Sequence, residues 1–279
     1  MVSLLLAVAT AAVWGTADFC GGKASQRAPA LAVSVMSKVV GLPVLALGLV
    51  AVGGTPTPAD LGWGACGGLF GMAGVLLLYR GLATGAMTIV APVTAVTSAL
   101  VPFGIGMAVD GAPGPMAMVG VACAIGAIAL VSSGPRDGRT PLAPAIIGPA
   151  LASGASFGLF MTLLSRAHPG AGLWPLTTAQ VTALSLGWLL LRRTRTGVSP
   201  SLSGATLRWT TAAGVLDFSA NAAYLLSTRD GALSVVAPVA SLYPATTVLL
   251  ALAVDRERVR PLQLAGLGLA AAALMLVAS

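Results

Sequence analysis

The chain has 279 residues, of which 57% are hydrophobic and only 8% are charged. A soluble domain carries about 25% charged residues, and a fold of this length cannot bury so much apolar surface. The mean hydropathy of +0.93 therefore indicates an integral membrane protein. The net charge of +7 gathers on no basic face, which excludes a nucleic-acid-binding protein, and the apolar composition excludes a disordered chain.

Ten apolar segments follow one another along the chain, each near the about 20 residues that a helix needs to cross the hydrocarbon core. The predicted helices span 3–22, 31–51, 61–79, 86–108, 115–133, 143–165, 174–191, 207–228, 232–254 and 261–278. Lipid offers the backbone no hydrogen-bonding partner, so each span must satisfy its own N–H and C=O groups. The predicted fold class is an all-α membrane protein with ten transmembrane helices.

Basic residues are distributed unevenly over the predicted loops. The first, third, fifth, seventh and ninth loops hold twelve Lys or Arg residues, whereas the other loops hold only Arg166 and Arg229. By the positive-inside rule, the basic loops face the cytoplasm and both termini lie outside.

The two halves of the chain are related by a shift of 146 residues. The block Val90–Val93 recurs as Val236–Val239 with both prolines in register. Each half holds five predicted helices, and an odd number reverses the direction in which the second half crosses the membrane. The sequence therefore predicts two inverted repeats, 1–138 and 139–279, which form two gates around one site near the midplane.

Charged residues inside the spans are candidates for function, because each costs about 2.5–3.5 kcal/mol at a helix centre on insertion scales. Asp217 lies ten residues into its predicted helix, and Asn221 and Tyr224 follow on the same helical face. We expect this face to line a cavity, with Asp217 binding a cation or a coupling proton. The alternative is a structural acid that is hydrogen-bonded between helices.

Asp18 and Lys38 are the charged residues within the first two spans. They are predicted either to form a structural ion pair, or to act separately. In the second case Asp18 lines the cavity, and Lys38 extends along the helix to the membrane surface.

Prolines interrupt the fourth and the ninth predicted helices at related depths, and Pro92 and Pro238 are the predicted hinge pair. In a carrier, such breaks expose carbonyl groups to a cavity and permit bending; the alternative is a passive kink. Hydroxyl side chains surround them: Thr94, Thr97, Ser98, Ser241, Tyr243, Thr246 and Thr247. These hydroxyl groups make the region polar enough to bind a small solute, but the region holds too few basic residues to bind a polyanion.

Two motifs that carry chemistry in other proteins are interpreted here as helix packing. Gly62–Gly67 matches G-x-G-x-x-G, but it opens a predicted transmembrane helix and follows no strand. Gly154–Gly158 matches G-x-S-x-G, yet Ser156 lies inside an apolar helix and the sole histidine, His168, lies in a loop. The three cysteines are scattered, so that no metal site and no cofactor are predicted.

The residues near both ends of the chain resemble a known family. The run Trp14–Phe19, and the run Ser241–Pro244 followed by Glu257, Gln263 and Gly266, are similar to EamA-type members of the drug/metabolite transporter superfamily. The resemblance implies a carrier whose central cavity is lined mainly by the first, third, fourth, sixth, eighth and ninth helices, with the fifth and tenth peripheral. It also implies cytoplasmic termini, which is opposite to the orientation that the loop charges predict.

The predicted function is a multi-pass carrier in the inner (plasma) membrane that exports or exchanges small metabolites, amino acids or drugs by alternating access. A proton is the candidate coupling ion, and no nucleic acid is an expected partner. The alternatives are an intramembrane enzyme of the serine hydrolase type and a non-transporting receptor or scaffold. The predicted substrate-binding residues are Trp14, Asp18, Tyr79, Thr94, Asp217, Asn221, Tyr224, Ser241 and Tyr243, of which Asp217 and Asp18 are also the predicted proton-coupling residues.

Overall fold

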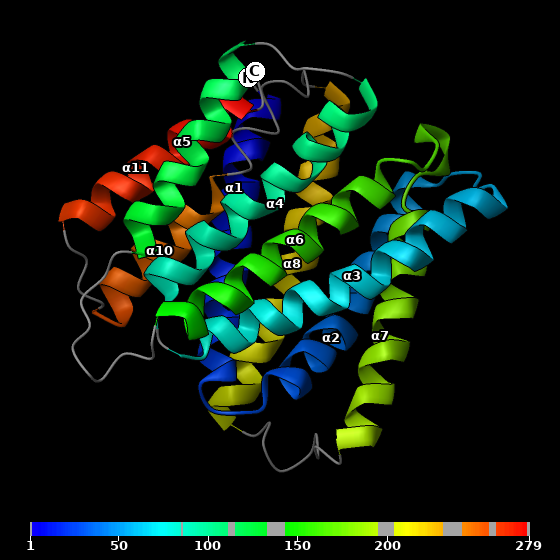
Figure 1. Ribbon diagram of the computed structural model, residues 1–279. Helices are drawn as coiled ribbons and strands as arrows, with labels where there is room; N and C mark the ends of the chain where they lie inside the picture. The colour runs from blue at the N-terminus through cyan, green and yellow to red at the C-terminus, as the bar shows by residue number, and fades with distance from the viewer. Residues whose placement is uncertain are drawn as a thin grey trace.

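The computed structural model describes residues 2–84, 86–110, 115–132, 143–194, 204–230, 242–256 and 261–277, and within these ranges it contains α-helices and no strand (Figure 1). The helices are α1 (Val2–Ser25), α2 (Ala30–Val52), α3 (Pro58–Leu82), α4 (Met87–Asp110), α5 (Pro115–Ser132), α6 (Ala143–Leu164), α7 (Trp174–Thr194), α8 (Gly204–Asp230), α10 (Tyr243–Val254) and α11 (Pro261–Val277). A 3-10 turn, η1 (Pro169–Ala171), precedes α7. The prediction of an all-helical fold is confirmed.

Each predicted span corresponds to one of these helices, with ends that differ by a few residues. Residues 232–241 of the predicted ninth span lie outside the described residues, and α10 covers most of the remainder. Within the described ranges, five helices are long and apolar enough to cross a membrane: Leu5–Ser25, Ala30–Val52, Pro58–Leu82, Met87–Ile105 and Ile146–Leu164. Large apolar side chains on the outer surface, such as Val50 at 87% exposure, suit a lipid environment.

The beginning of α3 shows how local sequence sets a helix end. Thr57 precedes the helix, its Oγ1 accepts a hydrogen bond from Asp60 N, and Asp60 Oδ2 accepts one from Thr57 N at 2.8 Å. This capping box satisfies backbone donors that have no partner inside the helix. Asp60 Oδ1 also accepts a hydrogen bond from His168 N at 2.7 Å, which fixes the segment between α6 and α7 against α3.

Small residues bring the helices into close contact. A Cβ atom added at Gly15 of α1 would lie 2.6 Å from Thr246 Cβ of α10, and one at Gly154 of α6 would lie 2.5 Å from Thr97 Cβ of α4. These separations are too short for real carbon atoms, so only glycine permits the approach. Gly64 likewise packs against the backbone of α7, in agreement with the packing interpretation of the G-x-G-x-x-G motif.

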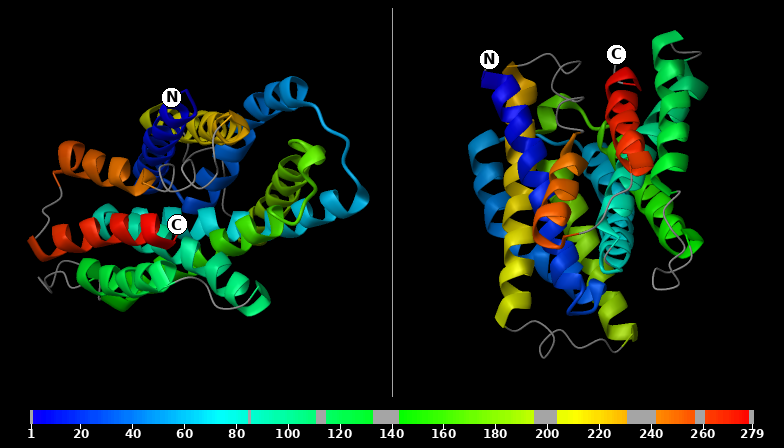
Figure 2. Two further views of the ribbon diagram at one scale, coloured as in Figure 1. Left: turned by 90° about the horizontal axis from the view of Figure 1, so that it is seen from above. Right: turned by 90° about the vertical axis from the view of Figure 1, so that its left-hand side faces the viewer.

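The helices are arranged so that α1 packs on α8, α3 packs on both α6 and α7, and α4 packs on α6. The pair α5 and α11 lies at the edge of the bundle, on the side away from α2 and α7 (Figure 1). The beginning of α1 and the end of α11 lie at the same end of the molecule (Figure 2). This arrangement leaves the middle of the bundle to helices from both halves of the chain.

Candidate functional site

A cavity of about 410 Å³ lies between the helices. Residues of α1, α2, α3, α4, α6, α7, α8 and α10 line it, whereas no described residue of α5 or α11 does. The structure thus adds α2 and α7 to the lining helices that the family resemblance implies, and it leaves α5 and α11 at the periphery. A volume of this size is ordinary for a small-molecule site.

Seven of the predicted site residues meet at this cavity. They are Trp14, Asp18, Tyr79, Asp217, Asn221, Tyr224 and Tyr243. These residues come from four helices that are distant in the chain, and α1 and α8, which carry most of them, pack along each other. On α8, the face that holds Asp217, Asn221 and Tyr224 is turned to the cavity, as the helical spacing predicts.

The remaining predicted residues lie elsewhere. Thr94 is fully buried between α4 and α6, where its Oγ1 donates a hydrogen bond to Ala150 O at 3.2 Å, and it does not line the cavity. Pro92 lies inside α4 and lines a separate apolar hollow of about 250 Å³ between α4, α10 and α11. Ser241 and Pro238 lie outside the described residues.

Three charged side chains line the cavity among the described residues, namely Asp18, Lys38 and Asp217, and each is half-buried. Asp18 and Lys38 form no ion pair in the described part of the chain, so that predicted alternative is not observed. Lys38 instead has Asp217 as its electrostatic neighbour, and Asp217 is also the neighbouring charge of Asp18. Lys38 is therefore a cavity residue, which the sequence did not indicate.

Polar groups on the neighbouring backbone support these residues. Gln180 of α7 donates a hydrogen bond from Nε2 to Lys38 O at 3.0 Å, which joins α7 to α2 at the cavity wall. Asn221 donates from Nδ2 to Asp217 O at 2.7 Å, one turn back along α8. Gln180 is absent from the residues predicted from the sequence, although a buried amide inside an apolar span is a signal that could have identified it.

An aromatic cluster forms another part of the wall, and we call Trp14, Tyr224 and Tyr243 the Trp14 cluster. The Trp14 ring centroid lies 5.5 Å from that of Tyr224 and 6.1 Å from that of Tyr243. Asp18 is one helical turn beyond Trp14 on α1, so its carboxylate and the aromatic rings belong to the same cavity.

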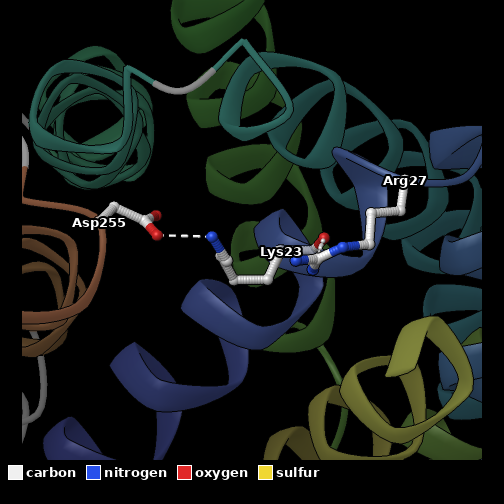
Figure 3. Close-up of polar contacts among 3 residues, drawn as sticks. All are labelled: Lys23, Arg27 and Asp255. Carbon is white, nitrogen blue, oxygen red and sulfur yellow. Dashed lines mark hydrogen bonds and ion pairs between the residues drawn. The ribbon is translucent and has the colours of Figure 1, made fainter. Parts of the chain in front are cut away.

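An ion pair joins the ends of two cavity helices (Figure 3). Lys23, in the last turn of α1, donates from Nζ to Asp255 Oδ1 at 2.5 Å, directly after α10, and the two side chains are 14% and 15% exposed. Arg27 lies beside this pair and donates to the backbone oxygen of Lys23 at 3.4 Å. The sequence placed Lys23 in a loop and assigned Asp255 no role.

The residues of the G-x-S-x-G motif do not form a catalytic pair with the histidine. Ser156 donates from Oγ to Ala152 O at 2.8 Å within its own helix, and Gly158 packs against α4. His168 is exposed, and its Nδ1 accepts a hydrogen bond from Gly170 N at 3.0 Å. Over the described ranges, no group of three His, Cys, Asp or Glu residues is arranged to hold a metal ion.

Comparison with known proteins identifies the family. Residues 1–133 match the model of the EamA-like transporter family, which covers α1 to α5 and confirms the resemblance noted in the sequence. No curated protein matches the chain. The match and the apolar spans agree on one class of molecule: the chain is a multi-pass membrane protein whose residues 1–133 match the model of the EamA-like transporter family.

Proposed function

We propose that the protein is a secondary carrier that moves small metabolites, amino acids or drugs across the inner (plasma) membrane by alternating access, in export or exchange, with a proton as the coupling ion. The observation that carries this proposal is one cavity at which helices of both halves of the chain converge. The cavity holds charged and aromatic side chains inside an apolar bundle, which suits transient binding of a small solute.

The helix packing supports the inverted repeats that alternating access requires. The counterparts in the two halves are α1 and α6, α2 and α7, α3 and α8, α4 and α10, and α5 and α11. If the halves are related by a repeat, each helix contact should recur between the two counterpart helices. The α1–α8 contact recurs as α6–α3, the α3–α7 contact as α8–α2, and the α4–α6 contact as α10–α1. The α5–α11 contact is its own counterpart.

Residue-level contacts support the same relation. Gly15 of α1 and Gly158 of α6 lie 143 residues apart, and each packs closely against a helix of the other half of the chain. A Cβ atom at Gly15 would overlap Tyr243 O of α10, and one at Gly158 would lie 2.9 Å from Ser98 O of α4. Tyr243 and Ser98 are themselves 145 residues apart. The proposed boundary between the repeats, at residues 138 and 139, lies outside the described residues.

Counterflow in proteoliposomes tests the carrier function. Vesicles that contain the purified protein and a high internal concentration of one unlabelled solute should accumulate the same labelled solute transiently, and a panel of amino acids and amines would identify it. A receptor or scaffold would bind a solute without counterflow, and a hydrolase would convert ester or amide substrates. Either result would contradict the proposal.

The orientation is tested by reporter fusions. Because the basic loops are expected to face the cytoplasm, a cytoplasm-active reporter after Ser279 should be silent and one inserted near Arg193 should be active. The reverse pattern of activities would mean that both termini are cytoplasmic, as the family resemblance implies.

The hinge proposal concerns Pro92 and Pro238. Replacing either proline by alanine restores a backbone donor and should stiffen the helix, because proline removes a hydrogen bond and clashes with the preceding turn. We expect exchange to become several-fold slower in each single variant, with normal membrane insertion and normal solute affinity. Unchanged exchange in both single variants and in the double variant would mean that the prolines are passive kinks.

A further inference from the structure

The charges of the cavity indicate the charge of its solute, and this inference rests on the proposed carrier function. Asp18 and Asp217 contribute two carboxylates, Lys38 contributes one ammonium, and every other described lining residue is uncharged. Residues 231–241, outside the described part, also include no charged residue. With all three groups ionised the lining carries one excess negative charge, which a bound cation would neutralise.

The two carboxylates differ in their surroundings. Asp217 has Lys38 as an electrostatic neighbour without a direct ion pair, so that the positive charge of Lys38 acts on Asp217. The neighbouring charge of Asp18 is Asp217, a second carboxylate, and Asp18 takes part in no ion pair among the described residues. The excess negative charge therefore belongs to Asp18, at the wall that also carries the Trp14 cluster.

A carboxylate beside aromatic faces is a combination that attracts organic cations, because the ring faces are negative and the carboxylate supplies a charged partner. We propose that the cavity takes a small organic monocation, with its ammonium group at Asp18 and its aromatic or apolar body against Trp14, Tyr224 and Tyr243. Lys38 acts electrostatically on Asp217 and not on Asp18, so its positive charge leaves the negative charge of Asp18 in place.

Three probes with one indole body test the charge preference: tryptamine is a cation, tryptophan a zwitterion and indole-3-propionate an anion. Competition against labelled tryptamine on the purified protein should rank them in that order, with at least about tenfold between the first and the last. Asp18→Asn should weaken tryptamine binding about tenfold or more, the loss expected for a charged hydrogen bond. Lys38→Met should tighten tryptamine binding, because it removes the positive charge from the lining and leaves two carboxylates.

Tighter binding of tryptophan or indole-3-propionate, binding of none of the three, or unchanged tryptamine affinity in Asp18→Asn would overturn the proposal. A thermal unfolding curve like that of the parent shows that Asp18→Asn is folded. Binding is measured without transport, so that absence of counterflow together with the expected ranking would overturn the carrier function and leave the charge preference standing.

A second inference comes from the register of the cavity helices. Thr247 of α10 donates from Oγ1 to Gly15 O of α1 at 3.0 Å, across 232 residues of sequence. The Lys23–Asp255 ion pair joins the same helices across the same separation of 232 residues. Since eight helical residues extend about 12 Å, α1 and α10 run in the same direction and stay in contact from the cavity to their ends.

We infer that the Lys23–Asp255 ion pair is a gate that holds the end of α1 against the end of α10 while one end of the cavity is closed. The ion pair is suited to opening because it lies at the helix ends, eight residues beyond the Thr247–Gly15 hydrogen bond. Asp255 Oδ2 has no hydrogen-bonding partner in the described part of the chain, so that parting the two helix ends breaks one ion pair, while the Thr247–Gly15 hydrogen bond and the packing at Gly15 can stay in place.

Accessibility of a reporter cysteine tests the gate. Ala17, which lines the cavity, is replaced by cysteine after Cys20, Cys66 and Cys123 have been replaced by alanine. Asp255→Asn should raise labelling by a water-soluble maleimide added on the Lys23 side about fivefold or more, as expected for a small population shift. The exchanged variant Lys23→Asp with Asp255→Lys should restore slow labelling.

Arg27→Ala is the matched control, because Arg27 is the neighbouring cation and donates a hydrogen bond to the backbone oxygen of Lys23, outside the ion pair itself. It should label like the parent. Unchanged labelling in Asp255→Asn, or fast labelling that the exchanged pair does not reverse, would overturn the gate. The exchanged pair also separates a lost gate from a folding defect. Slow labelling would return only if the protein is folded and the ion pair forms again with its charges reversed.

Discussion

An Asp18→Asn variant should lose the acceleration of transport that a pH gradient produces, while exchange without a gradient stays measurable. Among the described residues, Asp18 is the cavity carboxylate without a neighbouring cation, so we propose that a solute cation and a proton compete for it and that binding of one releases the other. Asparagine keeps the size of aspartate but cannot take up the proton. Tracer exchange from proteoliposomes, with and without an imposed pH gradient, measures the effect.

Asp217→Asn is the comparison for this experiment. Removing its charge leaves Lys38 uncompensated and brings the lining to zero net charge, so we expect slower exchange of a cation with its response to the gradient retained. The opposite result, a response retained in Asp18→Asn and lost in Asp217→Asn, would assign the proton to Asp217, the residue that helix position favours.

A Gly64→Ala variant should lose about 1–3 kcal/mol of stability, the usual cost of overpacking a helix contact. A Cβ atom at Gly64 would overlap Pro175 O of α7 and lie against Thr178 as well. Because the obstacle is backbone, it cannot turn aside as a flexible side chain could. Thermal unfolding of the purified variant, together with its yield of folded protein, checks the prediction.

Gly62→Ala is the matched control, two residues earlier in the same G-x-G-x-x-G motif. A Cβ atom at Gly62 would meet no atom within 4 Å, so that this variant should unfold like the parent. Equal losses in the two variants, or a neutral Gly64→Ala, would contradict the interpretation of this motif as helix packing.

The sequence alone determined the helices and the side chains that one helix presents together. Lipid requires long apolar segments, and these are visible as charge-free runs whose positions agree with the helices found. The spacing of Asp217, Asn221 and Tyr224 predicted one face, and that face lines the cavity. Helix ends depend on capping as well as on hydropathy, and the capping box at Thr57 begins α3 three residues before the predicted start.

Only the tertiary structure determined which helix each helical face packs against. The periodicity of apolar residues along one helix carries no information on the partner helix. Thr94 was predicted at the cavity, but packing turns it to α6, whereas Lys38 is brought to Asp217 and not to Asp18. The Lys23–Asp255 pair joins residues 232 positions apart. Such contacts depend on glycines that let particular helices approach, so only the assembled bundle determines which charges become neighbours.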